Sequence, residues 1–250
     1  MKILATIQAR MGSSRLPGKV LKHAGGQPLL LTQVRRLAMS EQVSEVIIAS
    51  TTNPQDDEIE EFASQHGIQV FRGSEHDVLQ RITDCVNSRN GELHVECFGD
   101  SPLIDPEIID FFIGHYLKSP EPIDMLTNSE PTTFPTGLEF NIYSHSVINT
   151  VNEMVDSEDP LREHVGYNIK RFPEKFRLVN LPAPRDLTAP ELVLEVDYEE
   201  DLQVIDGILT AFLPTKPERV STKQIIDFCR NNPYICSGNR ALERRWKNLD

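Results

Sequence analysis

Cysteines are few in this 250-residue chain, and no two of them stand at a metal-ligand spacing. The four cysteines form no CxxC pair, which excludes the common cysteine-based zinc sites. No apolar run approaches the roughly 20 residues that span a bilayer. Gln8 and Arg10 also interrupt the opening apolar run too early for a signal peptide. We therefore expect a cytoplasmic protein that does not bind to membranes.

Acidic side chains are absent from the first 40 residues, which carry seven Lys and Arg. The whole chain has 25 basic and 38 acidic groups, so a segment at +7 precedes a body at −20. The net charge of −13 argues against nonspecific binding to nucleic acid or to anionic membranes. A net-acidic protein with such a local excess of cations is expected to hold a strongly anionic ligand.

Short apolar segments alternate with helical patterns in the first half of the chain. Strands are expected over residues 3–7, 46–49, 67–71 and 94–98. Helices are expected to begin at Pro28, at Asn53-Pro54 and at Pro106 with Asp105 as the N-cap. Such alternation favours βαβ units and a mostly parallel sheet.

The rest of the chain begins with a proline-rich segment at residues 119–140. Further strands are expected at residues 138–143 and 192–196, and helices from Glu199 to Phe212 and from Ser221. No internal repeat is present. We predict an α/β protein with a three-layer Rossmann-like fold over residues 1–215, an inserted lobe at about 119–190, and a C-terminal helical extension over residues 216–250.

A polar loop with two glycines, residues 10–19, follows the first expected strand. Such a loop can present backbone N–H groups to phosphate oxygens while Arg10, Arg15 and Lys19 neutralise the charge. The loop matches neither the GxxxxGK[ST] nor the GxGxxG pattern, and the missing glycine fingerprint disfavours a dehydrogenase. Three cations suit a triphosphate. A flexible basic surface loop is the alternative.

Two aspartates follow expected strands. Asp100 lies in Gly99–Pro102, and Asp197 ends the segment Glu195–Asp197. Ligands in open α/β sheets bind beyond the carboxyl ends of the strands, and Mg²⁺ takes one or two protein carboxylates. The pair is a candidate Mg²⁺ site, although Asp100 alone suits a turn and Asp197 alone suits a helix cap.

Basic residues elsewhere form two weaker groups. Arg72 follows an expected strand and suits a phosphate or ribose. In the insert, Arg162 and His164 suit an acidic substrate, and a structural role for His164 is the alternative.

The segment Ile7–Lys19 closely resembles the opening motif of the sugar-acid cytidylyltransferases, which include the acylneuraminate and 3-deoxy-octulosonate enzymes. The chain is most similar to the spore-coat polysaccharide branch. Further similar segments follow in the family's order: Phe71–Ser74, Gly99–Asp105, Gly137–Glu139, Arg162–Val165 and Val196–Leu202.

The resemblance implies a nucleotide-diphospho-sugar transferase fold, a homodimer, and transfer of CMP from CTP to a sugar acid for surface polysaccharide biosynthesis. Five residues would be catalytic: Arg10, Arg15, Lys19, Asp100 and Asp197, the two aspartates holding Mg²⁺. The nucleotide would contact Ala9, Arg10, Met11, Gly12, Ser13, Arg15, Lys19, Arg72 and Phe98. The acceptor would contact Glu139, Asn141, Arg162 and His164.

Two positions depart from the family pattern. Phe98 stands where the better-studied enzymes often have a glutamine that helps to read cytosine, and Glu195 stands where they often have an aspartate. Phe98 leaves open another base or a sugar-phosphate acceptor. A nucleotide-binding protein without turnover is a further alternative, against which the presence of both Asp100 and Asp197 counts.

Overall fold

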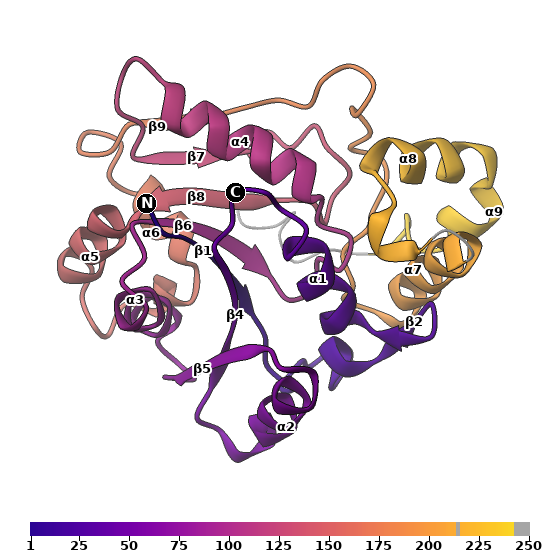
Figure 1. Cartoon of the computed structure of the whole chain (residues 1–250), viewed down its shortest axis with the longest axis horizontal. Helices are drawn as coiled ribbons and strands as arrows, with labels where there is room; N and C mark the ends of the chain where they lie inside the picture. Colours follow the sequence, from indigo (N-terminus) through magenta and orange to yellow (C-terminus); the bar gives the residue numbers. More distant parts are fainter. Residues whose placement is uncertain (214–215, 243–250) are drawn as a thin grey trace.

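The computed structural model describes residues 1–213 and 216–242. Its centre is a seven-stranded sheet of order β5-β4-β1-β6-β8-β7-β9 (Figure 1). Four neighbouring strands run parallel: β5 (Gln69–Gly73), β4 (Glu45–Thr51), β1 (Ile3–Gln8) and β6 (Leu93–Phe98). The sheet continues with β8 (Phe140–Ser144), antiparallel to β6, and then with β7 (Met125–Thr127) and β9 (Leu178–Asn180). The predicted α/β fold with a mostly parallel sheet is confirmed.

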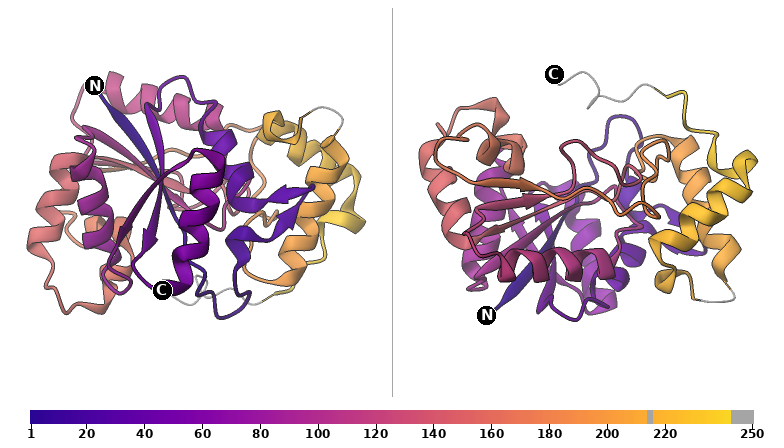
Figure 2. Two further views of the ribbon diagram at one scale, coloured as in Figure 1. Left: turned by 60° about the horizontal axis from the view of Figure 1, so that its bottom comes forward. Right: turned by 90° about the horizontal axis from the view of Figure 1, so that it is seen from above.

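Side chains of the strands alternate between two apolar cores. Ile3, Ala5 and Ile7 of β1 pack on one face with three helices: α1 (Leu29–Leu37), α2 (Asp57–His66) and α4 (Pro106–Lys118). Leu4 of the same strand faces the other core, with α3 (Val78–Ser88), α5 (His145–Met154) and α6 (Val165–Lys170). Figure 2 shows these layers from two further directions. The period of two along the strand therefore produces the three layers.

Helix starts follow the capping residues seen in the sequence. The Asp105 carboxylate accepts a hydrogen bond from the Glu107 N–H at 2.9 Å, as expected of an N-cap. Pro28 differs from the prediction, because it lies in strand β3 (Gln27–Pro28) and forms the N-cap of α1 instead of its first helical residue. Strand β3 pairs with β2 (His23–Ala24) in a small hairpin.

The strand predicted at residues 192–196 is wrong. This segment makes one isolated bridge, between Val193 and Thr136. In that bridge the Leu194 N–H donates to the Thr136 carbonyl at 2.7 Å, whereas the Val196 N–H donates to the Asp100 carbonyl, in another part of the chain, at 2.8 Å. The segment therefore crosses between two loops and does not follow one neighbouring strand.

Residues 119–190, predicted as an inserted lobe, contribute β7, β8 and β9 to the central sheet. Helix α7 (Glu199–Phe212) has the predicted bounds, and α8 (Thr222–Asn231) and α9 (Pro233–Cys236) follow it. These three helices form one side of the molecule (Figure 1). The predicted boundary at residue 215 and the end of the extension, residues 243–250, lie outside the described residues. None of the described helices is long and apolar enough to cross a bilayer.

Candidate active site

The loop after β1 is held by bonds within itself and to a neighbouring turn. The N–H groups of Ser13 and Gly18 both donate to the Met11 carbonyl, at 2.9 and 3.0 Å. The Met11 N–H donates to the Asp56 carboxylate at 2.7 Å. Gly18 has φ +66°, in the left-handed region that favours glycine. The loop is therefore pinned at Met11, while Gly12 is exposed.

Four charged side chains meet beyond the ends of β1 and β6, and we call them the carboxylate cluster: Arg15, Lys19, Asp100 and Asp197. The Lys19 ammonium lies 3.0 Å from Asp100 Oδ2 and 2.9 Å from Asp197 Oδ1. Arg15 Nη2 lies 2.7 Å from the same Asp197 oxygen. The structure thus brings together the two aspartates that the sequence could only place separately.

Lys19 is held in its charged form by these neighbours. Burial by itself would lower the pKa of the Lys19 ammonium, but the Asp100 and Asp197 carboxylates outweigh it and raise the pKa above the ordinary value. The cluster therefore has a fixed positive charge between two negative ones. Arg15 also stacks over the Tyr198 ring, with its guanidinium carbon 5.2 Å from the ring centre.

Close backbone contacts bring the two aspartates together. A Cβ on Gly99 would lie 2.4 Å from the Gln8 carbonyl oxygen, so only glycine lets the chain after β6 pass this near to β1. The Val196 N–H then bonds to the Asp100 carbonyl at 2.8 Å. Gly137, at φ +95°, packs against the backbone of Glu195, where a Cβ would lie 2.3 Å from the nitrogen.

The cluster fits a single divalent cation. Oxygens of Asp100 and Asp197 converge on one cationic group, the Lys19 ammonium. Mg²⁺ usually takes one or two protein carboxylates and completes its shell with phosphate oxygens and water. Across residues 1–213 and 216–242, no group of three or more His, Cys, Asp or Glu could hold a metal. At a Mg²⁺ site here, phosphate oxygens or water would therefore supply the remaining ligands, and the site stays a prediction.

Other predicted nucleotide contacts lie in or next to the loop after β1 and at the end of β6. Arg10 is exposed and forms an ion pair with Glu163 at 3.2 Å. Burial, with the nearby Arg10 charge, lowers the pKa of the Arg81 guanidinium to about 10. Ala9 is buried at the start of the loop, and Phe98 is half-buried at the end of β6.

Arg72 makes protein contacts with each of its guanidinium nitrogens. Its Nε and Nη2 donate to the carbonyls of Thr51 and Asn53 at 2.7 and 2.9 Å, and Nη1 lies 2.7 Å from carboxylate oxygens of Asp57 and Glu60. These bonds tie the end of β5 to the start of α2. A nucleotide contact for Arg72 would share a guanidinium whose three nitrogens already bind protein acceptors.

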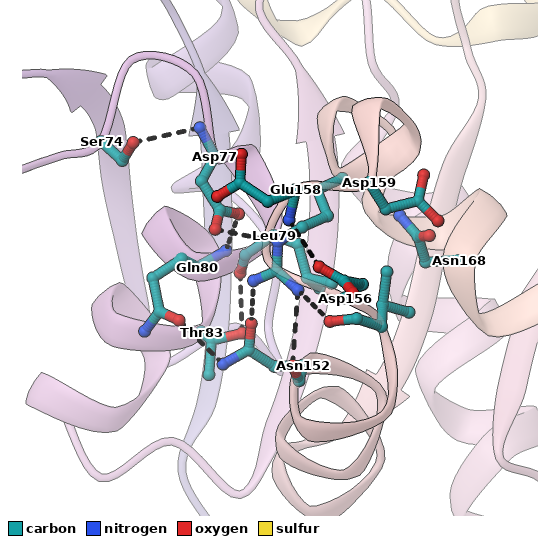
Figure 3. A network of polar contacts seen from close by, with 12 residues as sticks. Ser74, Asp77, Leu79, Gln80, Thr83, Asn152, Asp156, Glu158, Asp159 and Asn168 are labelled. Atoms are coloured by element: carbon teal, nitrogen blue, oxygen red, sulfur yellow. Dashed lines mark hydrogen bonds and ion pairs between the residues drawn. The ribbon is translucent and has the colours of Figure 1, made fainter.

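Arg162 is buried, with 4% of its side chain exposed. Its Nε lies 2.8 Å from Asp77, the N-cap of α3, and its other nitrogens donate to the carbonyls of Asn152 and Val155 and to the Asn152 side chain. We call these four residues the Arg162 clamp. Figure 3 shows Asp77 and Asn152 on opposite sides of this network. Arg162 thus joins α3 to α5, and each of its guanidinium nitrogens already donates to a protein acceptor.

Three further predicted acceptor contacts differ in their surroundings. Glu139 accepts a bond from the Gly137 N–H at 2.5 Å, and burial, with the neighbouring Asp100 charge, raises its pKa. Asn141 is buried and donates to Glu96 at 2.9 Å. His164 is exposed. Glu139 is therefore the predicted acceptor residue that the structure places near the cluster.

Comparison with known proteins identifies the family of the chain. A family model described as cytidylyltransferase matches residues 4–240. The chain belongs to the cytidylyltransferase family. The resemblance of its motifs to these enzymes is thereby confirmed.

Individual cytidylyltransferase relatives cover the chain to different extents. It is 31% identical over 243 residues to the spore coat polysaccharide biosynthesis protein SpsF of Bacillus subtilis, covering 96% of this chain and 98% of that protein. It is 32% identical over 124 residues to a 3-deoxy-manno-octulosonate cytidylyltransferase of Chlorobium phaeobacteroides, covering 49% and 48% of the two chains. A solved cytidylyltransferase structure from Leptospira borgpetersenii gives a TM-score of 0.88 at 31% identity, covering 98% and 100%.

Sequence reasoning missed two residues that support the segment carrying Asp197 in the candidate site. Asp201 Oδ2 accepts bonds from the N–H groups of Asp197 and Tyr198 at 2.9 and 2.8 Å. An acidic residue at the third helical position is a capping signal that the sequence does contain. Asn239, which contacts Asp201 from the end of the described chain, carries no such signal.

Proposed function

We propose that this cytidylyltransferase transfers CMP from CTP to a sugar acid, releasing pyrophosphate, in the biosynthesis of a surface polysaccharide. The carboxylate cluster is the observation that carries the proposal, because it sets cations and two converging carboxylates beside a loop suited to phosphates. The sugar-acid class and the pathway are supported by the names of the two curated relatives.

In the proposed reaction, a hydroxyl oxygen of the acceptor attacks the α-phosphorus of CTP. The new O–P bond forms as the bond to the departing pyrophosphate breaks, and the hydroxyl proton is released. Arg10, Arg15 and Lys19 would neutralise charge on the triphosphate and on the leaving group. Such a transfer depends on positioning and electrostatics, so it needs no nucleophilic side chain.

Asp100 and Asp197 would hold Mg²⁺, which when bound would neutralise phosphate charge. In the protein as described, the Lys19 ammonium pairs with both carboxylates. Phosphate oxygens would therefore compete with the two aspartates for this cation. That competition links the entry of the nucleotide to the freeing of the aspartates.

Pyrophosphate release tests the proposal. We would supply Mg²⁺ with CTP, UTP, ATP or GTP, and a panel of nonulosonic acids, octulosonic acids and sugar phosphates. We expect release only with CTP and with a sugar acid, and loss of release in Asp100→Asn. Asp227→Asn on the exposed face of α8 is the matched control, since it removes a carboxylate far along the chain that pairs only with Lys223 among the ion pairs described.

Two results would contradict the proposed acceptor class and the role of Asp100, and a third would favour another function. Release with a sugar phosphate and not with any sugar acid would move the acceptor to another class. Full turnover in Asp100→Asn would show that Asp100 is not a required Mg²⁺ ligand. CTP binding without release for any acceptor would favour the nucleotide-binding alternative.

A further inference from the structure

The C-terminal extension, described here over residues 216–242, is anchored in the core by a buried arginine of α1. Arg36 is fully buried, and its guanidinium donates to the carbonyls of Ile104 at 2.7 Å, Val220 at 2.9 Å and Glu218 at 3.1 Å. A buried guanidinium with carbonyl partners is costly to separate from them. The start of the extension is therefore fixed to the chain that follows Asp100.

A second contact joins the C-terminal extension to the segment Gly99–Asp105, which contains Asp100. Asp105 closes the Gly99–Asp105 segment, and its Oδ2 accepts bonds from the Thr222 N–H and hydroxyl, both at 2.7 Å. Its other oxygen caps α4. The residue read from the sequence as a helix cap thus also binds the first turn of α8. The position of the Asp100 loop is in this way tied to the extension.

A third contact joins Asn239, near the end of the described extension, to the segment that contains Asp197. Asn239 Nδ2 donates to Asp201 Oδ1 at 2.7 Å and to the Val193 carbonyl at 3.1 Å. Both residues are buried, with 1% of Asn239 and none of Asp201 exposed. Asp201 in turn accepts from the backbone of Asp197. Asn239 therefore contacts the segment that carries Asp197 on both sides of that residue.

We propose that Asn239 is a positioning residue for the Asp197 carboxylate, and that the C-terminal extension sets the distance between Asp197 and Asp100. The extension binds one motif through Thr222 and the other through Asn239, so it spans the two chain segments whose side chains converge on Lys19. The chain of contacts runs from Asn239 to Asp201, and from there to the backbone of Asp197. The catalytic consequence rests on the proposed function, whereas the positional one does not.

Hydrogen exchange of the free protein tests the positional part directly. In Asn239→Ala, the amides of residues 193–198 should exchange about tenfold faster, the factor expected when a charge-assisted hydrogen bond is lost. Amides of β4 should be unchanged. Asn232→Ala is the matched control, because Asn232 lies in the same extension and caps α8 through the Phe228 carbonyl at 2.9 Å. Native exchange of residues 193–198 in Asn239→Ala would overturn the proposal.

A binding experiment tests the consequence for the carboxylates. Mn²⁺ in the presence of CTP, without acceptor, is followed by electron paramagnetic resonance. Loss of a residue that orients a metal ligand typically weakens metal binding about tenfold or more, so Asn239→Ala should show that loss while CTP affinity without Mn²⁺ stays native. An equal loss in Asn232→Ala would mean general loosening of the extension and would also overturn the proposal.

The two hypotheses fail in different ways. Faster exchange at residues 193–198 in a protein that releases no pyrophosphate would uphold the positional role and reject the proposed reaction. If Asn239→Ala does not fold, Asp201→Asn keeps the shape of the side chain and removes one of the two oxygens that link Asn239 to the backbone of Asp197. That variant should then show the faster exchange at residues 193–198, and native exchange would overturn the proposal.

Discussion

The carboxylate cluster and the Arg162 clamp both pair an arginine with an aspartate, yet the two sites have opposite characters. Arg15 meets Asp197 at 2.7 Å with 23% of its side chain exposed, and Arg162 meets Asp77 at 2.8 Å with 4% exposed. In the cluster, two cations share one oxygen of Asp197. In the clamp, every guanidinium nitrogen has its own acceptor.

The contrast shows that a short ion pair alone does not identify a functional site. Competing cations on one carboxylate leave donors that a ligand can take over, and partial exposure gives the ligand access. Arg162 is buried and all three of its nitrogens have protein acceptors, so it has neither property, and its removal leaves buried acceptors unpaired. Substitutions in the carboxylate cluster should therefore lower mainly the turnover rate. Substitutions in the Arg162 clamp should lower mainly the free energy of unfolding.

The largest effect is expected in the cluster. Asp197→Asn should lower the rate of pyrophosphate release roughly a thousandfold, which corresponds to about 4 kcal/mol of transition-state stabilisation. The melting temperature should fall only slightly below that of Asp227→Asn, because the amide keeps an oxygen for Lys19 and Arg15. Steady-state kinetics and calorimetry on the two variants make this measurement. Native turnover in Asp197→Asn would contradict the prediction that the carboxylate cluster, unlike the Arg162 clamp, acts in the reaction.

The clamp should show the reverse pattern. Arg162→Met should lower the free energy of unfolding by about 3 kcal/mol, because it leaves Asp77 and two backbone carbonyls without their donor. Urea denaturation measures this loss. Arg171→Met is the matched control, since its pair with Asp159 at 2.6 Å is more exposed and should contribute about 1 kcal/mol or less. An acceptor affinity that falls in Arg162→Met, with stability unchanged, would restore the predicted substrate contact.

A smaller effect concerns the pH dependence of the cluster. Because the folded-state pKa of Lys19 is raised, its pairing stabilises the protein fully below the ordinary value of 10.5 and is lost as pH rises through the folded pKa. The difference in unfolding free energy between the native protein and Lys19→Met should therefore shrink between about pH 8 and about pH 11. Urea midpoints at the two pH values measure it. A constant difference would show that the carboxylates do not perturb Lys19.

Local signals in the sequence predicted much of the fold. Buried strands such as Ile3–Gln8, and helices with strong caps such as those at Asp105 and Ser221, were recognised because their pattern lies within one element. Strands β7 and β9 have three residues each, too few for a periodic pattern. Residues 192–196 have the composition of a strand, but their hydrogen bonds go to two separate loops.

The candidate site was predicted less evenly. Residues of the loop and the two aspartates were found because the type of side chain indicates the chemistry. Whether an arginine binds a ligand or the protein depends on its tertiary neighbours, and this is why the surroundings of Arg72 and Arg162 could not be predicted. Asn239 was missed for the same reason, since its partners Val193 and Asp201 lie far from it in the chain.

Gly99 and Asp100 are adjacent, but they are subject to different constraints. The glycine is required by the backbone of β1, which leaves no room for a Cβ, and this requirement holds whether or not a reaction takes place. In the proposed reaction, the aspartate would be required only for its carboxylate at the cluster. A homologue that has lost turnover should therefore keep the glycine, whereas its aspartate is free to be substituted during evolution. The residue at position 100 should then distinguish active homologues from inactive ones.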